Sequence, residues 1–246
     1  QHEAVKTRRD QLEDVIENAM RAGGTLMIPA FSIERTQEVL YEIEQMSAEG
    51  RIPRVPVYLD SPLAIQVTAV YKKFQAYLSK RVIDPDLGRD GIFNFPNLRK
   101  TLAGSESRAI PTNERKVIIA GSGMSNGGRI IHHEKHYLSD PRSTLLLVGY
   151  QSVGSLGRLL QDGAKRVNIL GQEIQVAARV VTISGYSAHR DTDGLLDFVG
   201  QAADTLKNVY LAMGEPKSAF FLAQRIQDYL GLRANVPRLG EKFVLY

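Results

Sequence analysis

The alternation of apolar and polar positions predicts helices and strands that follow one another along the chain. Over residues 12–20 the apolar positions recur at helical spacing, and Gly23 and Gly24 end this helix before the apolar run of residues 25–30. That run is short and uninterrupted, so we expect a buried strand. A second helix is expected to begin after Ser32.

Another strand is expected at residues 57–59, directly before Asp60-Ser61-Pro62. Serine followed by proline favours a helix start, because the hydroxyl accepts a backbone hydrogen bond and proline needs no donor in the first turn. We therefore predict a helix over residues 63–77 with a cap at its start, and presentation of Ser61 to a phosphate is the alternative use of this position. Between residues 82 and 115 only short, irregular elements are expected.

The central part of the chain reads as a strand, a glycine-rich loop and a helix. The strand is expected at residues 116–120, the loop at 121–128 and the helix up to residue 138, before a further strand at 143–149. Backbone N–H groups in such a loop can hold an anion. The loop has neither the Walker pattern nor the dinucleotide fingerprint, so phosphate binding and an ordinary tight turn both stay open.

The last third continues the alternation, which indicates an α/β fold. Residues 166–170 and 174–183 are expected to form strands joined by a turn at 171–173, and Ser187 to Asp191 begins a helix. The remaining expected elements are a strand at 208–212, a helix at 216–230 and short strands near residue 236 and at 243–245.

Composition excludes several classes of protein. The chain has 246 residues and no cysteine, so disulfides, iron–sulfur clusters and cysteine nucleophiles are excluded, and any metal needs His, Asp or Glu ligands. The absence of cysteine fits a reducing cytoplasm. A net charge of +4 is too small to indicate nucleic acid by itself. No apolar run has membrane-spanning length, and because the chain begins at Gln1 within a helical pattern we expect a fragment or a processed product.

Histidines are the candidate metal ligands. His189 follows a strand and opens a helix, where it is either a ligand or an ordinary polar residue at a helix start. His132 and His136 share a helix face with His133 between them, but the glutamate of a zinc-protease motif is not in place. We interpret these three histidines as a solvated helix face, with Glu134 pointing elsewhere.

Taken in order, segments across nearly the whole chain resemble the β-CASP ribonucleases of the metallo-β-lactamase superfamily, relatives of the endonuclease that processes 3′ ends in cleavage and polyadenylation. Their order along the chain is more specific than any single segment. The matching segments are residues 24–32 with 35–38, 58–64, 118–124, 149–151 with 154–157, 185–189 and 239–242.

The resemblance implies a β-CASP domain inserted in the C-terminal part of a metallo-β-lactamase αββα fold. It places residues 1–31 in the lactamase fold, 32–154 in the β-CASP domain and 155–246 in the returning lactamase segment. It also implies hydrolysis of single-stranded RNA by a pair of zinc ions (Zn2+) in a cleft between the domains. The site residues that it implies are His189 as a zinc ligand, with Ser187, Ala188, Ser122, Gly123, Ser61 and Arg35 facing RNA phosphates.

The chain departs from the family pattern at several positions. The family's other metal ligands precede the region that resembles Gln1, so we expect the isolated chain to need the N-terminal lactamase half and to be inactive without it. The resemblance places Leu159 where the family has a histidine, and Met213 where many relatives have another. The alternative is an RNA-binding or regulatory module without catalytic activity. A homodimer stays open.

Overall fold

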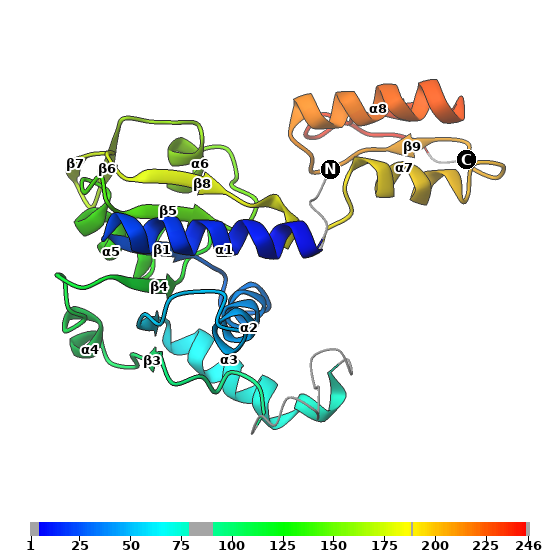
Figure 1. Cartoon of the computed structure of the whole chain (residues 1–246). Coiled ribbons are helices and arrows are strands. Elements are labelled where there is room, and N and C mark those ends of the chain that lie inside the picture. Colours follow the sequence, from blue (N-terminus) through cyan, green and yellow to red (C-terminus); the bar gives the residue numbers. More distant parts are fainter. Residues whose placement is uncertain (1–4, 79–90, 188, 245–246) are drawn as a thin grey trace. The chain divides into compact units, whose positions relative to one another are not determined.

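A computed structural model of the chain describes residues 5–78, 91–187 and 189–244 (Figure 1). These residues divide into two units, one reaching Ser187 and one beginning at Ala188, and each is described by itself. The expected domain boundaries at residues 31 and 154 both lie inside the first, larger unit. Among the described helices, none combines the length and apolar character of a transmembrane span.

A six-stranded, fully parallel sheet forms the centre of the larger unit. Its strand order is β3-β2-β4-β1-β5-β8, so the two longest strands, β4 and β1, lie side by side in the middle. Because neighbouring strands run in the same direction, their carboxyl ends meet at one edge of the sheet. The strands are β1 Thr25–Pro29, β2 Val57–Leu59, β3 Leu98–Lys100, β4 Lys116–Ala120, β5 Thr144–Leu147 and β8 Arg179–Thr182.

Helices cover both faces of this sheet, as a buried parallel sheet requires. Alternate residues of β1 point to opposite sides: Leu26 and Ile28 pack into a core with the first three helices, whereas Met27 packs into a second core with α5 and α6. This explains why β1 is a continuous apolar run. The helices are α1 Val5–Ala22, α2 Arg35–Ala48, α3 Pro62–Lys73, the 3₁₀ turn η1 Gln75–Tyr77, α4 Gly104–Arg108, α5 Ile130–Tyr137, α6 Leu156–Gln161 and the 3₁₀ turn η3 Ser184–Tyr186.

Most of the predicted elements of this unit are confirmed. The helix predicted over residues 63–77 is shorter, since α3 ends at Lys73 and η1 follows as a separate turn. Ser61 caps α3 as expected, and its hydroxyl accepts the N–H of Ala64 at 3.3 Å. The weak pattern up to residue 115 corresponds to the short β3 and α4, while residues 79–90 lie outside the described part.

The prediction of one strand over residues 174–183 is wrong. β7 (Gln172–Gln175) pairs with β6 (Arg166–Ile169) in an antiparallel hairpin, whereas β8 belongs to the large sheet. The chain leaves the hairpin because the N–H groups of Ala177 and Ala178 bond instead to the carbonyl of Leu138, at 2.8 and 2.9 Å. The hairpin turn is Leu170-Gly171, both at positive φ, and not residues 171–173.

The C-terminal unit contains two helices and a short parallel strand pair. α7 (Thr192–Gly200) begins at the end of the segment predicted to start a helix and is capped by Asp191, and α8 (Pro216–Leu230) has the predicted bounds. β9 (Val209–Tyr210) pairs with β10 (Ala234–Asn235), and the strand expected from residue 243 does not form at residues 243 and 244. Large apolar side chains are exposed on α7 and α8, among them Phe198, Phe220, Phe221 and Tyr229.

Candidate functional site

The loops that follow β1, β2 and β4 meet at the carboxyl edge of the sheet. Backbone hydrogen bonds hold them together, from Ala30 N–H to the carbonyl of Ala120 at 3.0 Å and from Asp60 N–H to that of Ile119 at 2.8 Å. The hydroxyl oxygens of Ser32 and Ser61 then lie 3.3 Å apart. Three segments that resemble the family motifs are therefore neighbours, although they are far apart in the sequence.

The glycine-rich loop after β4 is held mainly by its own hydrogen bonds. Ser122 donates its N–H to the carbonyl of Gly127 at 3.0 Å, and its hydroxyl accepts the N–H of Asn126 at 3.1 Å. Gly123 is buried beneath the Phe31 ring, where an added Cβ would lie only 2.8 Å from a ring carbon. Both predicted residues lie at this edge, but Gly123 is covered by an aromatic ring that is itself half-exposed.

A second loop, at residues 149–157, holds the glycine-rich loop in place through hydrogen bonds. The buried Gln151 amide donates to the carbonyls of Gly123 and Gly149, both at 3.0 Å. The N–H of Gly157 donates to the carbonyl of Met124 at 3.1 Å. The family motif marked this segment as part of the site but did not indicate its role. In the structure, its hydrogen bonds fix the shape of the glycine-rich loop.

Arg35 lies next to the segment that leads to Ser187. Its guanidinium sits 5.6 Å from the centre of the Tyr186 ring and pairs with Glu38. The same ring stacks under the Arg8 guanidinium at 4.4 Å, and its hydroxyl donates to Glu42, which also pairs with Arg8. Burial raises the pKa of the Tyr186 hydroxyl, and the Glu42 carboxylate raises it further, so the phenol stays protonated.

His189 lies in the C-terminal unit and is exposed, whereas Ala188 falls outside the described residues. Each remaining predicted residue belongs to the larger unit. Within the described part of the chain, no three His, Asp or Glu side chains are grouped so that they could hold a metal ion. The residues present therefore do not fit a zinc pair, and no step of hydrolysis is assigned to them.

A buried carboxylate at the end of β2 is the main polar feature that the sequence did not reveal. Asp60 is fully buried and accepts hydrogen bonds from Thr101 at 2.7 Å, Ser107 at 2.6 Å, Arg129 at 2.6 Å and His133 at 2.7 Å. Burial alone raises the pKa of Asp60, but the four donors together hold it well below its ordinary value. Asp60 is thus an ionised anchor that joins β2, α4 and α5.

The interpretation of the three histidines as a solvated face is wrong for the middle one. His132 and His136 are exposed, as expected, but His133 is buried because its ring points at Asp60. Glu134 is also completely buried and accepts a hydrogen bond from Ser125 in the glycine-rich loop. Burial raises the pKa of Glu134 to about 8, against the opposing effect of that hydrogen bond.

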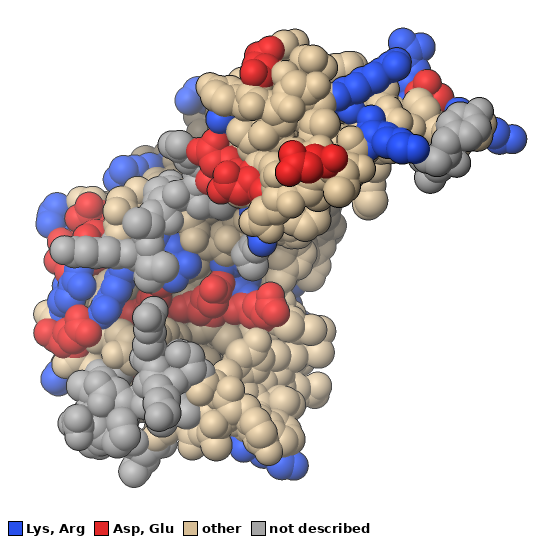
Figure 2. Space-filling model, turned by 90° about the vertical axis from the view of Figure 1, so that its right-hand side faces the viewer, with Lys and Arg blue, Asp and Glu red and all other residues tan. Residues whose placement is uncertain are grey.

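The two positions where the resemblance implies a departure from the family are both open to solvent. Leu159 on α6 is half-exposed, and Met213 in the C-terminal unit is fully exposed. On the visible face of the larger unit, acidic and basic side chains are interspersed and form no continuous basic surface (Figure 2). The distribution of charged side chains therefore does not indicate an RNA-binding surface on that face.

Comparison with known proteins identifies the class. The family description "Beta-Casp domain" matches residues 36–160, and "Zn-dependent metallo-hydrolase RNA specificity domain" matches residues 173–237. The chain belongs to the β-CASP family of metallo-β-lactamase-fold proteins, and its α/β architecture around a parallel sheet agrees with a β-CASP insertion in that fold.

Several curated relatives are similar over almost the whole chain. Ribonuclease TTHA0252 of Thermus thermophilus is 37% identical over 96% of the chain, and an RNase J-like protein of Methanocaldococcus jannaschii is 31% identical over 96%. Transcription termination factor FttA of Pyrococcus horikoshii is 32% identical over 92%. The chain spans 53%, 54% and 36% of these three proteins, respectively.

Proposed function

We propose that this chain is the RNA-gripping part of a metal-dependent ribonuclease that cuts single-stranded RNA in RNA processing or decay. The observation that carries the proposal is the meeting of three motif loops at the carboxyl edge of the sheet, with the Ser32 and Ser61 hydroxyls 3.3 Å apart. In α/β sheets ligands bind outside this edge. Membership of a family that contains ribonucleases supports the reaction class.

Exposed aromatic rings beside these loops suit RNA. Phe31 follows β1 and is 47% exposed, and Tyr150 follows β5 and is 58% exposed. Nucleic-acid bases stack on such rings without sequence preference, while hydroxyl and backbone N–H groups bind phosphates. The proposed roles are base stacking for the two rings and phosphate contacts for Ser61, Ser122 and Arg35.

The metal chemistry is proposed for the protein with its lactamase half. His189 is proposed as one zinc ligand, with Ser187 and Ala188 beside it and the other ligands outside these 246 residues. Bound zinc would activate water for attack on the phosphodiester. We propose the domain limits 1–31, 32–154 and 155–246 on the same resemblance, and leave a homodimer as an open arrangement.

Fluorescence anisotropy with a labelled single-stranded RNA tests the gripping role. Tyr150→Ala should weaken binding by about tenfold or more, because a stacked base contributes ~1–3 kcal/mol. Tyr77→Ala is the matched control, since Tyr77 is 87% exposed but follows the far end of α3. Equal affinities for both variants and the unchanged chain, or no RNA binding at all, would count against the proposal.

A further inference from the structure

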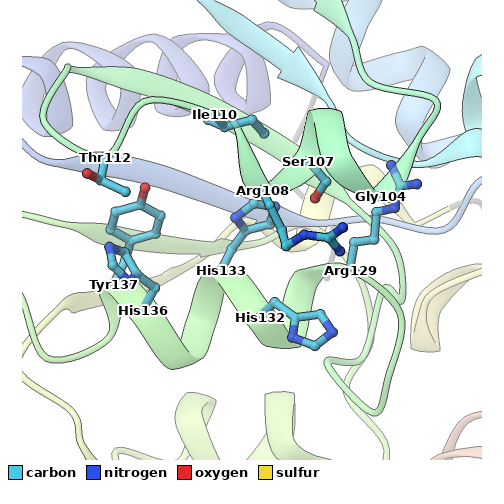
Figure 3. A pocket seen from close by; sticks show the side chains of 10 residues that line it. All are labelled: Gly104, Ser107, Arg108, Ile110, Thr112, Arg129, His132, His133, His136 and Tyr137. Carbon is cyan, nitrogen blue, oxygen red and sulfur yellow. The ribbon is translucent and has the colours of Figure 1, made fainter.

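A pocket between α4 and α5 lies apart from the residues that the family resemblance selects. Its volume is about 550 Å³, within the range of small-molecule sites. Figure 3 shows the side chains that line it, among them Ser107, Arg108, Arg129 and His132. None of the site residues predicted from the sequence is part of this lining.

The polar lining of the pocket is basic. Two arginines and three histidines contribute to it, and the Asp60 carboxylate, which Arg129 and His133 contact, is fully buried and already accepts four side-chain hydrogen bonds. The Arg129 guanidinium belongs to the wall of the pocket, where it donates to Asp60 and to the carbonyls of Thr101 and Leu102. Arg129 therefore fixes the shape of the pocket and has its charge balanced.

The positive charge of Arg108 is not balanced by a carboxylate of the described residues. It is exposed at the end of α4, and within the described part of the chain no carboxylate lies within ion-pair distance of it. The His132 imidazole, which also lines the pocket, has no acidic partner among the described residues either. A guanidinium together with an imidazole is a donor set for an oxyanion.

The opposite end of the pocket is apolar. Ile110 and the Tyr137 ring form it, and the His136 ring stands edge-on to Tyr137 at 4.5 Å between ring centres. A cation at one end and an apolar wall at the other match a phosphate joined to an organic group. The volume exceeds what a bare phosphate needs.

We propose that this pocket binds the phosphate group of a nucleotide-sized ligand, with Arg108 as the principal cation. The phosphate belongs either to a nucleotide within an RNA strand or to a free phosphorylated molecule. Arg108 would recognise the phosphate in the same way in both cases. Buried Asp60 and His133 together with Arg129 position the wall, and Arg108 with His132 contacts the ligand. This inference is independent of metal binding and of RNA cleavage.

Isothermal titration calorimetry of the 246-residue chain, without added metal, tests the pocket with three probes: inorganic phosphate, adenosine monophosphate and a short single-stranded RNA without a terminal phosphate. We expect saturable binding of adenosine monophosphate that Arg108→Ala weakens by about tenfold or more, since a charge-assisted hydrogen bond is lost. Arg108→Lys should restore part of the affinity. Arg21→Ala, which removes a 74%-exposed arginine of α1, should change nothing.

The probes also separate the two sources of phosphate. If the RNA binds and loses affinity in Arg108→Ala to the same degree, the ligand is a nucleotide within a strand. If only adenosine monophosphate or inorganic phosphate responds, the ligand is a free phosphorylated molecule. The proposal is overturned if no probe binds saturably, or if Arg108→Ala and Arg21→Ala have equal effects.

Discussion

The Asp60 carboxylate and the His133 imidazole lie 2.7 Å apart, although 73 residues separate them in the sequence. Together with Arg129 they tie the end of β2 to the start of α5, beneath the pocket and beside the motif loops. Asp60 immediately precedes Ser61, so one segment both anchors the sheet edge and supplies a proposed RNA contact.

Removal of this anchor should destabilise the larger unit strongly. Asp60→Ala leaves the buried His133 imidazole without its acceptor and removes the carboxylate that balances the Arg129 guanidinium, which typically costs about 3–5 kcal/mol. Urea unfolding measures the loss. Asp162→Ala is the control, because its carboxylate is 61% exposed and pairs only at the surface with Arg158, so a change below about 1 kcal/mol is expected. A similar small loss for both variants would refute the anchoring role.

Glu134 should make stability fall as the pH rises. Its folded pKa of about 8 lies above the ordinary value of 4.5, so between these values the unfolded chain has lost a proton that the folded chain keeps. The contribution of Glu134 therefore becomes unfavourable from pH 4.5 upwards and levels off above about pH 8. Glu134→Gln should remove that slope. The free energy of unfolding of the variant, relative to that of the unchanged chain, should therefore increase as the pH rises.

Urea unfolding at pH 5, 6, 7 and 8 gives these slopes, and Glu173→Gln provides the control because its carboxylate is 68% exposed. We expect the Glu173→Gln curve to run parallel to that of the unchanged chain. A Glu134→Gln curve that is also parallel would show that Glu134 is ionised throughout this range.

Two adjacent glycines of the loop should respond differently to alanine. Gly128 has φ +74°, and an added Cβ would lie 2.4 Å from the carbonyl oxygen of Gly121, which is backbone and cannot rotate away. Gly128→Ala should therefore cost about 1–3 kcal/mol and disturb the loop. A Cβ at Gly127 meets nothing within 4 Å, so Gly127→Ala should be nearly neutral. Thermal unfolding of both variants tests this, and equal midpoints would contradict it.

Tyr186 should stabilise the segment that leads to Ser187 through its hydroxyl. Tyr186→Phe removes a buried hydrogen bond to the Glu42 carboxylate while the ring keeps its contact with the Arg8 guanidinium, and should cost about 1.5–3 kcal/mol. Tyr71→Phe is the control, because its ring packs against Phe93 and its hydroxyl bonds to no described residue. Chemical denaturation distinguishes the two, and an unchanged midpoint for Tyr186→Phe would exclude the role.

Local patterns predicted much of the fold because each is a short-range property. β4 and α8 have their predicted bounds, since an apolar run and a proline-started amphipathic stretch depend only on neighbouring residues. The split between β7 and β8 was missed because it depends on hydrogen bonds to Leu138, more than thirty residues earlier. The period of apolar residues carries no information about such partners.

The site was less predictable for the same reason. The order of the motifs indicated which loops matter, and the structure brings Ser61, Ser122 and Gly123 to one edge. No pattern in the sequence connects Asp60 with His133, because a buried charge pair is specified by tertiary packing. The sequence of α5 therefore suggested a solvent-exposed face, although the His133 imidazole on it is buried.

The measurement that tests the central claim most directly is cleavage of a 5′-labelled single-stranded RNA with zinc supplied. It compares this chain, the chain extended to the length of its relatives, and the extended chain with His189→Ala. The account predicts that only the extended chain cuts, and that His189→Ala abolishes cutting while RNA binding is kept. An extended chain that takes up zinc and binds RNA without cutting it would contradict the account and favour an RNA-binding module.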